Sequence, residues 1–255
     1  MLFNPIIDRL RKWCIGKAEV YQKAYAQYGG AVYVGCQIAY ELEFKLSARI
    51  DKDFESTEAF KKEIHDLINV HYIPSVITPS NRSAQYVIDK TNREFLDCFE
   101  DLLSADGSFA PANIPYKRVI VGAEADALKN KFSSVWKYEN TSCWFPLMGE
   151  EPKEIKDKFF VMLDRFVPYG EQICSLIGLP KAHIYGYGEY TFFPEHCIET
   201  SELNEYDGCE MLYTDKAFSW AIYFSHENTV SFAGAIVPKA QELLAQEKPY
   251  WNRFI

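Results

Sequence analysis

Hydrophobic residues recur at helical spacing over the first part of the chain. Within residues 5–28, Ile6, Leu10, Trp13 and Val20 fall at near-helical intervals, and a proline suits the first turn. Two glycines follow this range. The pattern predicts a helix over 5–28 that stops at the glycine pair.

The pattern changes after this helix. From Gln37 to Ile50 apolar residues alternate with polar ones, so that Tyr40 and Phe44 belong to the apolar set and Glu43 to the polar set. Strict alternation is typical of a strand with one face in water. We therefore predict a strand over residues 37–50, with a helix as the alternative.

Helical spacing returns in the next segments. Ser56 or Thr57 can cap a helix that carries Phe60, Ile64 and Leu67 inward and ends before residue 74. Residues 84–88, AQYVI, are expected to form a short strand.

A second cap is expected soon after this strand. Thr91 and Glu94 have the spacing of a capping box. The helix that they open is predicted to bury Phe95 and Phe99 and to expose Asp97 and neighbouring acids.

Residues 104–115, SADGSFAPANIP, combine a glycine, two prolines and small polar residues. Such a composition favours a linker. The chain is accordingly expected to divide into a mostly helical N-terminal domain, 1–105, and a C-terminal α+β domain, 116–255.

The C-terminal region mixes both kinds of element before it becomes β-rich. Strands are expected at 118–121 and 143–147, and helices at 123–136 and from Pro152 through Phe166, resuming after Pro168 to Gly178. After Pro180, the aromatic and β-branched runs 183–192, 209–213, 220–224 and 229–237 predict antiparallel strands. The turn 225–228, SHEN, predicts a hairpin, and Pro238 the start of a terminal helix. The fold class is α+β.

Net charge limits the possible partners of the protein, and apolar run length and cysteine content indicate where it is located. The net charge is −9, and basic residues do not cluster beyond Arg9, Arg11 and Lys12, which argues against nucleic acid and anionic lipid. No apolar run approaches the length of a membrane span, and no signal peptide is visible. Seven widely spread cysteines without a C-x-x-C pair are typical of a reducing compartment, so a cytoplasmic location is expected.

Catalytic motifs do not emerge from the sequence. It contains no P-loop, nucleophile elbow or zinc-protease helix, and Gly186 and Gly188 lack the third glycine of a dinucleotide fingerprint. No cofactor or metal is therefore expected. One enzymatic alternative is a hydrolase that uses His226 with Cys197 or Glu227.

The acidic residues of the C-terminal region are concentrated in one stretch. Between Gly186 and Val230, nine acids against the single Lys216 give a local charge of −8. We predict that this stretch forms an acidic, aromatic-rich face that binds a basic protein. The candidate partner-binding residues are Glu189, Glu195, Glu199, Glu202, Glu205, Asp207, Glu210, Asp215, Tyr206 and Tyr213. The alternative for the same residues is a solvated surface over an aromatic core.

A further alternative concerns the N-terminal region. A structural or adaptor subunit would use that region for self-association, in which case Tyr40 and Phe44 would be exposed rather than buried.

Residues 213–237, YTDKAFSWAIYFSHENTVSFAGAIV, resemble the C-terminal hairpin of bacterial immunity proteins that are encoded beside contact-dependent or polymorphic toxins. The strand at 118–121, Trp136 and the run CWFPL at 143–147 accompany it, so the resemblance covers at most residues 116–255. It implies a non-catalytic protein that neutralises a basic toxin, in many cases a nuclease, by covering its active site with an acidic face. It matches no interface residue individually.

Overall fold

The computed structural model describes residues 1–28, 30–69, 82–105, 112–139, 144–147, 155, 157–179, 182–188, 193–196 and 210–254. These residues form two compact units, Met1–Ile114 and Pro115–Ile255. The junction lies within the predicted linker 104–115. Helices precede a sheet of antiparallel strands, so the fold is α+β as predicted.

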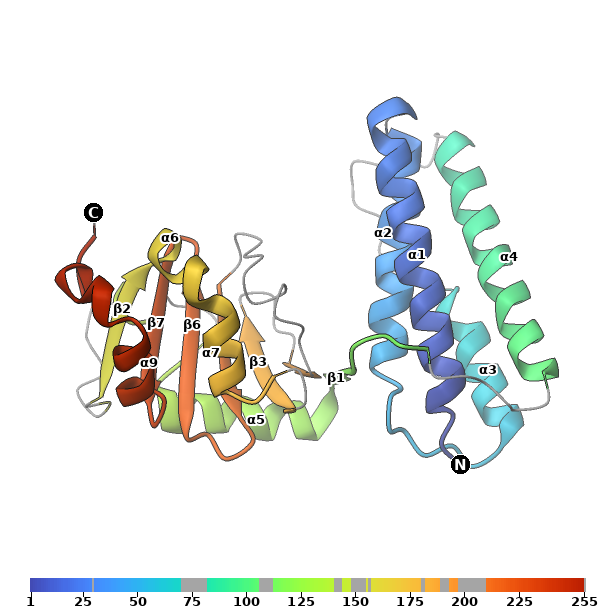
Figure 1. Cartoon of the computed structure of the whole chain (residues 1–255). Helices are drawn as coiled ribbons and strands as arrows, with labels where there is room; N and C mark the ends of the chain where they lie inside the picture. Colours follow the sequence, from blue (N-terminus) through green and yellow to red (C-terminus); the bar gives the residue numbers. More distant parts are fainter. Residues whose placement is uncertain are drawn as a thin grey trace. The chain divides into compact units, whose positions relative to one another are not determined.

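The N-terminal unit consists of helices α1 (Asn4–Tyr28), α2 (Gly30–Ser47), α3 (Thr57–Leu67) and α4 (Arg82–Ser104), with α1, α2 and α4 as its long members (Figure 1). The small residues Ala18, Cys36 and Ala39 let α1 and α2 pack closely. A Cβ on Gly35 would lie 2.7 Å from the ring of Tyr21, so glycine makes room for that ring. The Tyr21 hydroxyl in turn lies 2.6 Å from Thr91 Oγ1 on α4.

The strand predicted over 37–50 is wrong and its helical alternative is right over residues 37–47, which belong to α2, whereas residues 48–50 form a turn. An alternating pattern repeats every second residue, and therefore also every fourth, so it is compatible with one face of a helix. Ile38, Leu42 and Leu46 form that buried face. The helix leaves the Tyr40 side chain 48% exposed and Phe44 half-buried. The adaptor alternative expected both side chains to be exposed, and only Tyr40 is.

Two further predictions for this unit are wrong because α4 begins earlier than expected. Residues 84–88 form a turn of α4 and bury Ala84 and Ile88 at helical spacing. Thr91 caps no helix, since it lies inside α4 and donates its hydroxyl hydrogen to Val87 O at 2.7 Å. The predicted cap of α3 is confirmed, with Ser56 Oγ accepting from Ala59 N at 3.1 Å.

The C-terminal unit is built on a seven-stranded antiparallel sheet in the order β1-β4-β3-β5-β6-β7-β2. Its strands are β1 (Lys117–Ile120), β2 (Lys158–Met162), β3 (Ile184–Gly188), β4 (Phe193–His196), β5 (Met211–Asp215), β6 (Trp220–Ser225) and β7 (Thr229–Gly234). The predicted hairpin is confirmed, because Ser225 pairs with Thr229 across the SHEN turn.

Helices cover both faces of this sheet (Figure 1). On one face α6 (Leu163–Phe166), the 3-10 turn η1 (Val167–Tyr169), α7 (Gly170–Leu176) and α9 (Val237–Leu243) enclose a core that contains Phe159, Val161 and Phe232. On the other face α5 (Gly122–Trp136) together with Tyr138, Trp144 and Phe145 encloses a core that contains Phe160, Tyr187 and Tyr223. The chain then continues through the 3-10 helix η2 (Ala245–Tyr250).

The burial of β2 on both faces explains why the helix predicted from Pro152 through Phe166 is wrong over Lys158–Met162. A strand covered on both sides has no polar face, and its continuous apolar run is easily taken for a buried helix. The strand predicted at 143–147 is also wrong: residues 145–147 form a turn with a cis bond before Pro146, and Cys143 lies outside the described residues.

Buried hydrogen bonds attach Trp144 and Phe145 to the sheet and to the end of α5. Trp144 N donates to the Tyr223 hydroxyl at 3.2 Å, and Trp144 Nε1 donates to Trp136 O at 2.7 Å. Ser231 Oγ donates to Phe145 O at 2.7 Å. These bonds satisfy polar groups that water does not reach.

The free edge of β2 is covered by the end of the chain. Phe160 N donates to Asn252 Oδ1 at 3.0 Å, and Asn252 N donates to Phe160 O at 3.0 Å. The rings of Phe159 and Trp251 pack at 5.0 Å between centroids. No helix of the described residues is long and apolar enough to cross a membrane.

The substitution Tyr223→Phe is expected to destabilise the C-terminal unit by about 1–3 kcal/mol, because it leaves the buried N–H of Trp144 without its acceptor. Urea unfolding followed by tryptophan fluorescence measures the effect. Tyr250→Phe, which removes a hydroxyl from a partly exposed ring of the same unit, is the matched control. An equal, small change in both variants would contradict the role assigned to the Tyr223 hydroxyl.

Candidate functional site

Four acids of the acidic stretch, Glu195, Glu210, Asp215 and Glu227, lie among the described residues of the C-terminal unit, and the last three have side-chain partners within it. Glu210 is only 4% exposed, directly before β5. Asp215 accepts hydrogen bonds from Ser219 N and Ser219 Oγ, both at 2.6 Å. Glu227 lies in the β6–β7 turn, 3.4 Å from His226 Nε2. Glu210 therefore does not belong to an exposed acidic face.

The buried carboxylate of Glu210 collects donors from β6 and from the turn that follows. His226 Nδ1 lies 3.0 Å from Glu210 Oε1, and Ser225 Oγ donates to the same oxygen at 3.5 Å. Burial raises the pKa of Tyr223, and the hydrogen bond that its hydroxyl makes to Glu210 raises it further. The result is a continuous chain of hydrogen bonds from Trp144 N through Tyr223 to Glu210.

This cluster has part of the arrangement of a hydrolase. A buried carboxylate orients an imidazole through Nδ1 and leaves Nε2 facing outward on a side chain that is 44% exposed. Ser225, however, directs its hydroxyl to Glu210 and accepts a hydrogen bond from Glu227 N at 3.2 Å. His226 Nε2 lies 3.4 Å from the carboxylate of Glu227. A carboxylate has no proton for a neighbouring base to remove, so the imidazole does not activate it as a nucleophile.

The other predicted residues are placed less completely. Tyr213 lies in β5, partly buried, with its ring 6.1 Å from that of Phe224. Glu195 lies in β4, opposite Arg118 of β1 and Tyr185 of β3. Outside the described residues lie Glu189, Glu199, Glu202, Glu205, Asp207, Tyr206 and Cys197.

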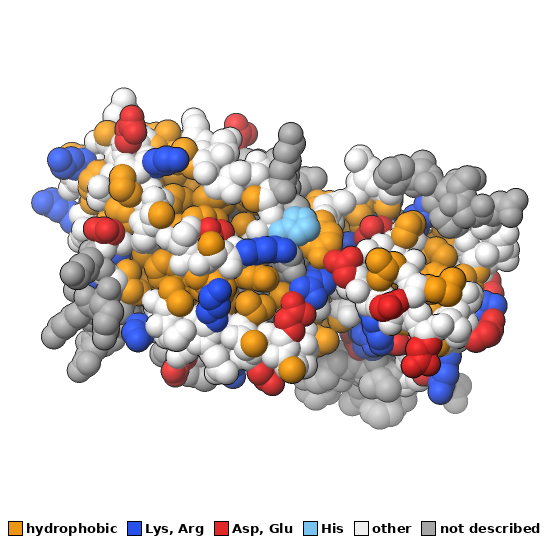
Figure 2. All heavy atoms as spheres, turned by 90° about the horizontal axis from the view of Figure 1, so that it is seen from below, with side chains coloured by type: hydrophobic (Ala, Val, Ile, Leu, Met, Phe, Trp, Pro, Cys, Tyr) orange, Lys and Arg blue, Asp and Glu red, His pale blue; other side chains and the backbone are white. Residues whose placement is uncertain are grey.

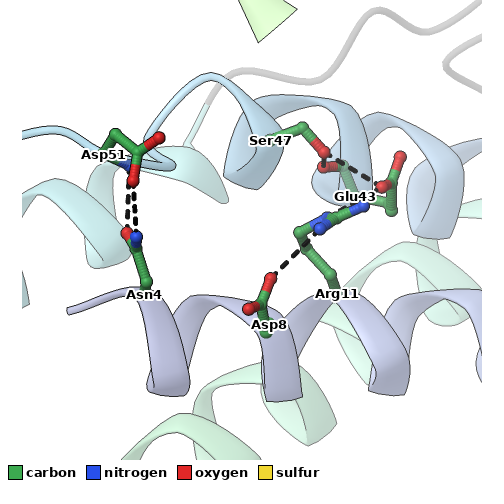
Figure 3. Close-up of polar contacts among 6 residues, drawn as sticks. All are labelled: Asn4, Asp8, Arg11, Glu43, Ser47 and Asp51. Carbon is green, nitrogen blue, oxygen red and sulfur yellow. Dashed lines mark hydrogen bonds and ion pairs between the residues drawn. The ribbon is translucent and has the colours of Figure 1, made fainter. Parts of the chain in front are cut away.

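A second polar cluster joins α1 to α2 in the N-terminal unit (Figure 3). Arg11, 2% exposed, donates from Nε to Glu43 Oε1 at 3.0 Å and from one terminal nitrogen to Asp8 Oδ1 at 3.1 Å. Ser47 Oγ donates to Glu43 Oε1 at 3.0 Å. Burial raises the pKa of Asp8, although the charge of Arg11 opposes that shift.

The sequence pattern does not predict the contact between Arg11 and Glu43. The strand predicted over residues 37–50 would place Glu43 on the solvated face, whereas in α2 the same residue is buried and pairs with Arg11. The cluster holds two helices in register and satisfies a buried guanidinium. We assign it a structural role.

A groove of about 610 Å³ lies between α2 and α3 and is lined by Lys45, Arg49, Lys62, Glu63 and Asp66 among others. Two of its basic residues are engaged in polar contacts within the unit. Arg49 Nε donates to Glu63 Oε1 at 2.9 Å, and Lys45 donates to the Leu67 carbonyl at 3.1 Å. The Arg49–Glu63 ion pair thus spans the groove and joins α3 to the end of α2.

Figure 2 shows one face of the molecule, on which acidic and basic side chains are interspersed with hydrophobic ones. Among the side chains that the figure colours, no patch of a single charge stands out. Among the residues that the structure describes, histidine, cysteine and acidic side chains form no group of three or more able to hold a metal ion. No family model, curated protein or solved structure matches the chain.

The substitution Arg11→Met is expected to cost about 3–5 kcal/mol, because it leaves Glu43 buried without a counter-charge. The double variant Arg11→Met with Glu43→Leu should recover most of that loss. Urea unfolding followed by the circular dichroism of the helices gives both values. If the double variant loses the sum of the two single losses, the pair is not coupled.

A pH dependence follows from Glu63. Partial burial opposes its ionisation, but hydrogen bonds and charges from Lys52 and Arg49 outweigh burial and lower the pKa of this carboxyl. A depressed folded-state pKa contributes stability above the unfolded value of about 4.3, and that contribution is lost as the pH falls through the folded value.

The substitution Glu63→Gln should therefore lower the unfolding free energy near pH ~7 by about 1 kcal/mol, and the difference from the parent should shrink toward pH ~3. Glu58→Gln, on the same helix and 82% exposed, is the control and should change little. A Glu63→Gln deficit that is equal at both pH values would contradict the pKa assignment.

Proposed function

We propose that the chain is a non-catalytic protein-binding module that neutralises a basic protein, as an immunity protein neutralises its cognate toxin in the cytoplasm of the producing cell. The observation that carries the proposal is the charge of residues 189–207. This range holds six acids and no lysine or arginine. The acids that the structure finds engaged internally, Glu210, Asp215 and Glu227, all lie outside it.

The sheet fixes the residues that flank this range. Gly188, which ends β3 directly before the range, pairs with Met211 of β5, and β4 inside the range pairs with β1 and β3. The Glu210 cluster adds hydrogen bonds next to Met211. A segment anchored on both sides to a rigid sheet loses less conformational entropy on binding than a free one does.

The composition of the range suits a cationic protein surface. Its acids would accelerate association by electrostatic attraction, and desolvated ion pairs would then hold the complex. Tyr190, Phe192 and Tyr206 are interleaved with the acids, and aromatic side chains within a charged rim are frequent centres of binding energy. The resemblance of residues 213–237 to immunity-protein hairpins supports the same function.

The test is a charge reversal. The variant Glu202→Lys, Glu205→Lys, Asp207→Lys should associate at least about tenfold more slowly with the basic toxin domain encoded beside this chain's gene, measured by stopped flow at about 50 mM salt. The difference in association rate between variant and parent should be smaller at about 300 mM salt, because screening weakens the electrostatic attraction between the parent and the toxin domain.

A matched control separates local from overall charge. Glu58→Lys, Asp97→Lys, Asp101→Lys changes the net charge by the same amount at exposed positions of α3 and α4. It should retain most of the parent's rate. Equal slowing of both variants would refute binding through residues 189–207, and failure of the parent to bind the toxin domain or to protect cells from it would refute the function.

A further inference from the structure

Helices α1 and α4 contact each other through side-chain pairs that follow one another at intervals of about one helical turn. The Tyr21 hydroxyl lies 2.6 Å from Thr91 Oγ1, and Lys17 forms an ion pair with Glu94. These two contacts step back along α1 from residue 21 to residue 17 and forward along α4 from residue 91 to residue 94. The next step of the series leads to residue 14 on α1 and residue 98 on α4, which are Cys14 and Cys98. In antiparallel helices such steps keep successive pairs on the facing sides.

Neighbouring contacts locate the two thiols at this interface. The rings of Trp13 and Phe95, which precede the two cysteines on their helices, lie 5.8 Å apart. Both cysteines are free; Cys14 is fully buried and Cys98 is half-buried. Cys98 is therefore the thiol that a reagent in solution can reach.

The surroundings keep both thiols protonated. Burial raises the pKa of Cys14, and the neighbouring carboxylate of Glu43 and thiol of Cys98 add to that shift while Arg11 opposes it. Burial also raises the pKa of Cys98, with Asp101 adding to it. Because the thiolate is the reactive form, the reduced pair is stable until an oxidant is supplied.

We propose that Cys14 and Cys98 form a redox-sensitive disulfide site that closes in the presence of a small-molecule disulfide such as oxidised glutathione. The Cys98 thiolate attacks one sulfur of glutathione disulfide and releases one glutathione thiolate. Cys14 then gives up its proton and attacks the Cys98 sulfur, which releases the second glutathione. One protein disulfide forms, and one glutathione disulfide is reduced to two thiols.

The bond would close a loop that contains α2 and α3. Cross-links that close long loops restrict the unfolded chain most strongly, so oxidation should raise the unfolding temperature of the N-terminal unit. The site is independent of residues 189–207 and stands or falls separately from the proposed function.

The experiment treats the folded, full-length chain with oxidised glutathione, alkylates the remaining thiols and digests with trypsin without reduction. Mass spectrometry should find residues 13–17, WCIGK, linked to residues 94–117 as the main product. Thermal unfolding of the oxidised chain should shift upward by about 10 °C.

Two variants serve as controls. Cys36→Ser removes another buried thiol of this unit and should leave the link and the shift intact, whereas Cys98→Ser should abolish both. A stable mixed disulfide of Cys98 with glutathione, no reaction at Cys98, a link from Cys14 to Cys36, or a lowered unfolding temperature after oxidation would each overturn the proposal.

Discussion

Polar groups that are buried among aromatic and aliphatic side chains must find partners inside the protein, and both units are arranged around that constraint. In the N-terminal unit the guanidinium of Arg11 is enclosed between α1 and α2 and is satisfied by Glu43 and Asp8. In the C-terminal unit the carboxylate of Glu210 is enclosed at one end of the sheet and receives donors from Ser225 and His226. Leaving such groups unpaired would cost more than most single contacts contribute.

The same constraint narrows the functional interpretation. Counting acids along the chain treats every carboxylate as available to a partner, but a carboxylate that completes an internal hydrogen-bond network is not. Glu210 is occupied in this way, whereas Asp215 and Glu227 contact neighbouring side chains at the surface, and six of the nine acids lie within residues 189–207, on which the electrostatic argument rests. Residues 210–228, by contrast, form a rigid support next to that range.

The sequence predicted those elements whose pattern admits one interpretation. The amphipathic α3 with its Ser56 cap, and the β6–β7 hairpin with its polar turn, have periods that fit a single structure. Predictions were wrong where one pattern fits two structures: an every-second-residue alternation in α2 also satisfies a four-residue repeat, and β2 has no polar face to reveal its period. The Arg11–Glu43 pair and the burial of Glu210 depend on contacts between residues distant in sequence, which periodicity cannot reveal.

The pairing of Asn252 with Phe160 has a consequence for solubility. The outer edge of a sheet offers unpaired amide and carbonyl groups to any other extended chain, and this is a common route to aggregation. Here a single asparagine, in a left-handed conformation at φ 55°, uses its side-chain oxygen and its own amide to occupy those groups at the middle of β2. The few residues after η2 therefore act as a protective cover, and removing them would expose a strand edge flanked by phenylalanine rings to neighbouring molecules.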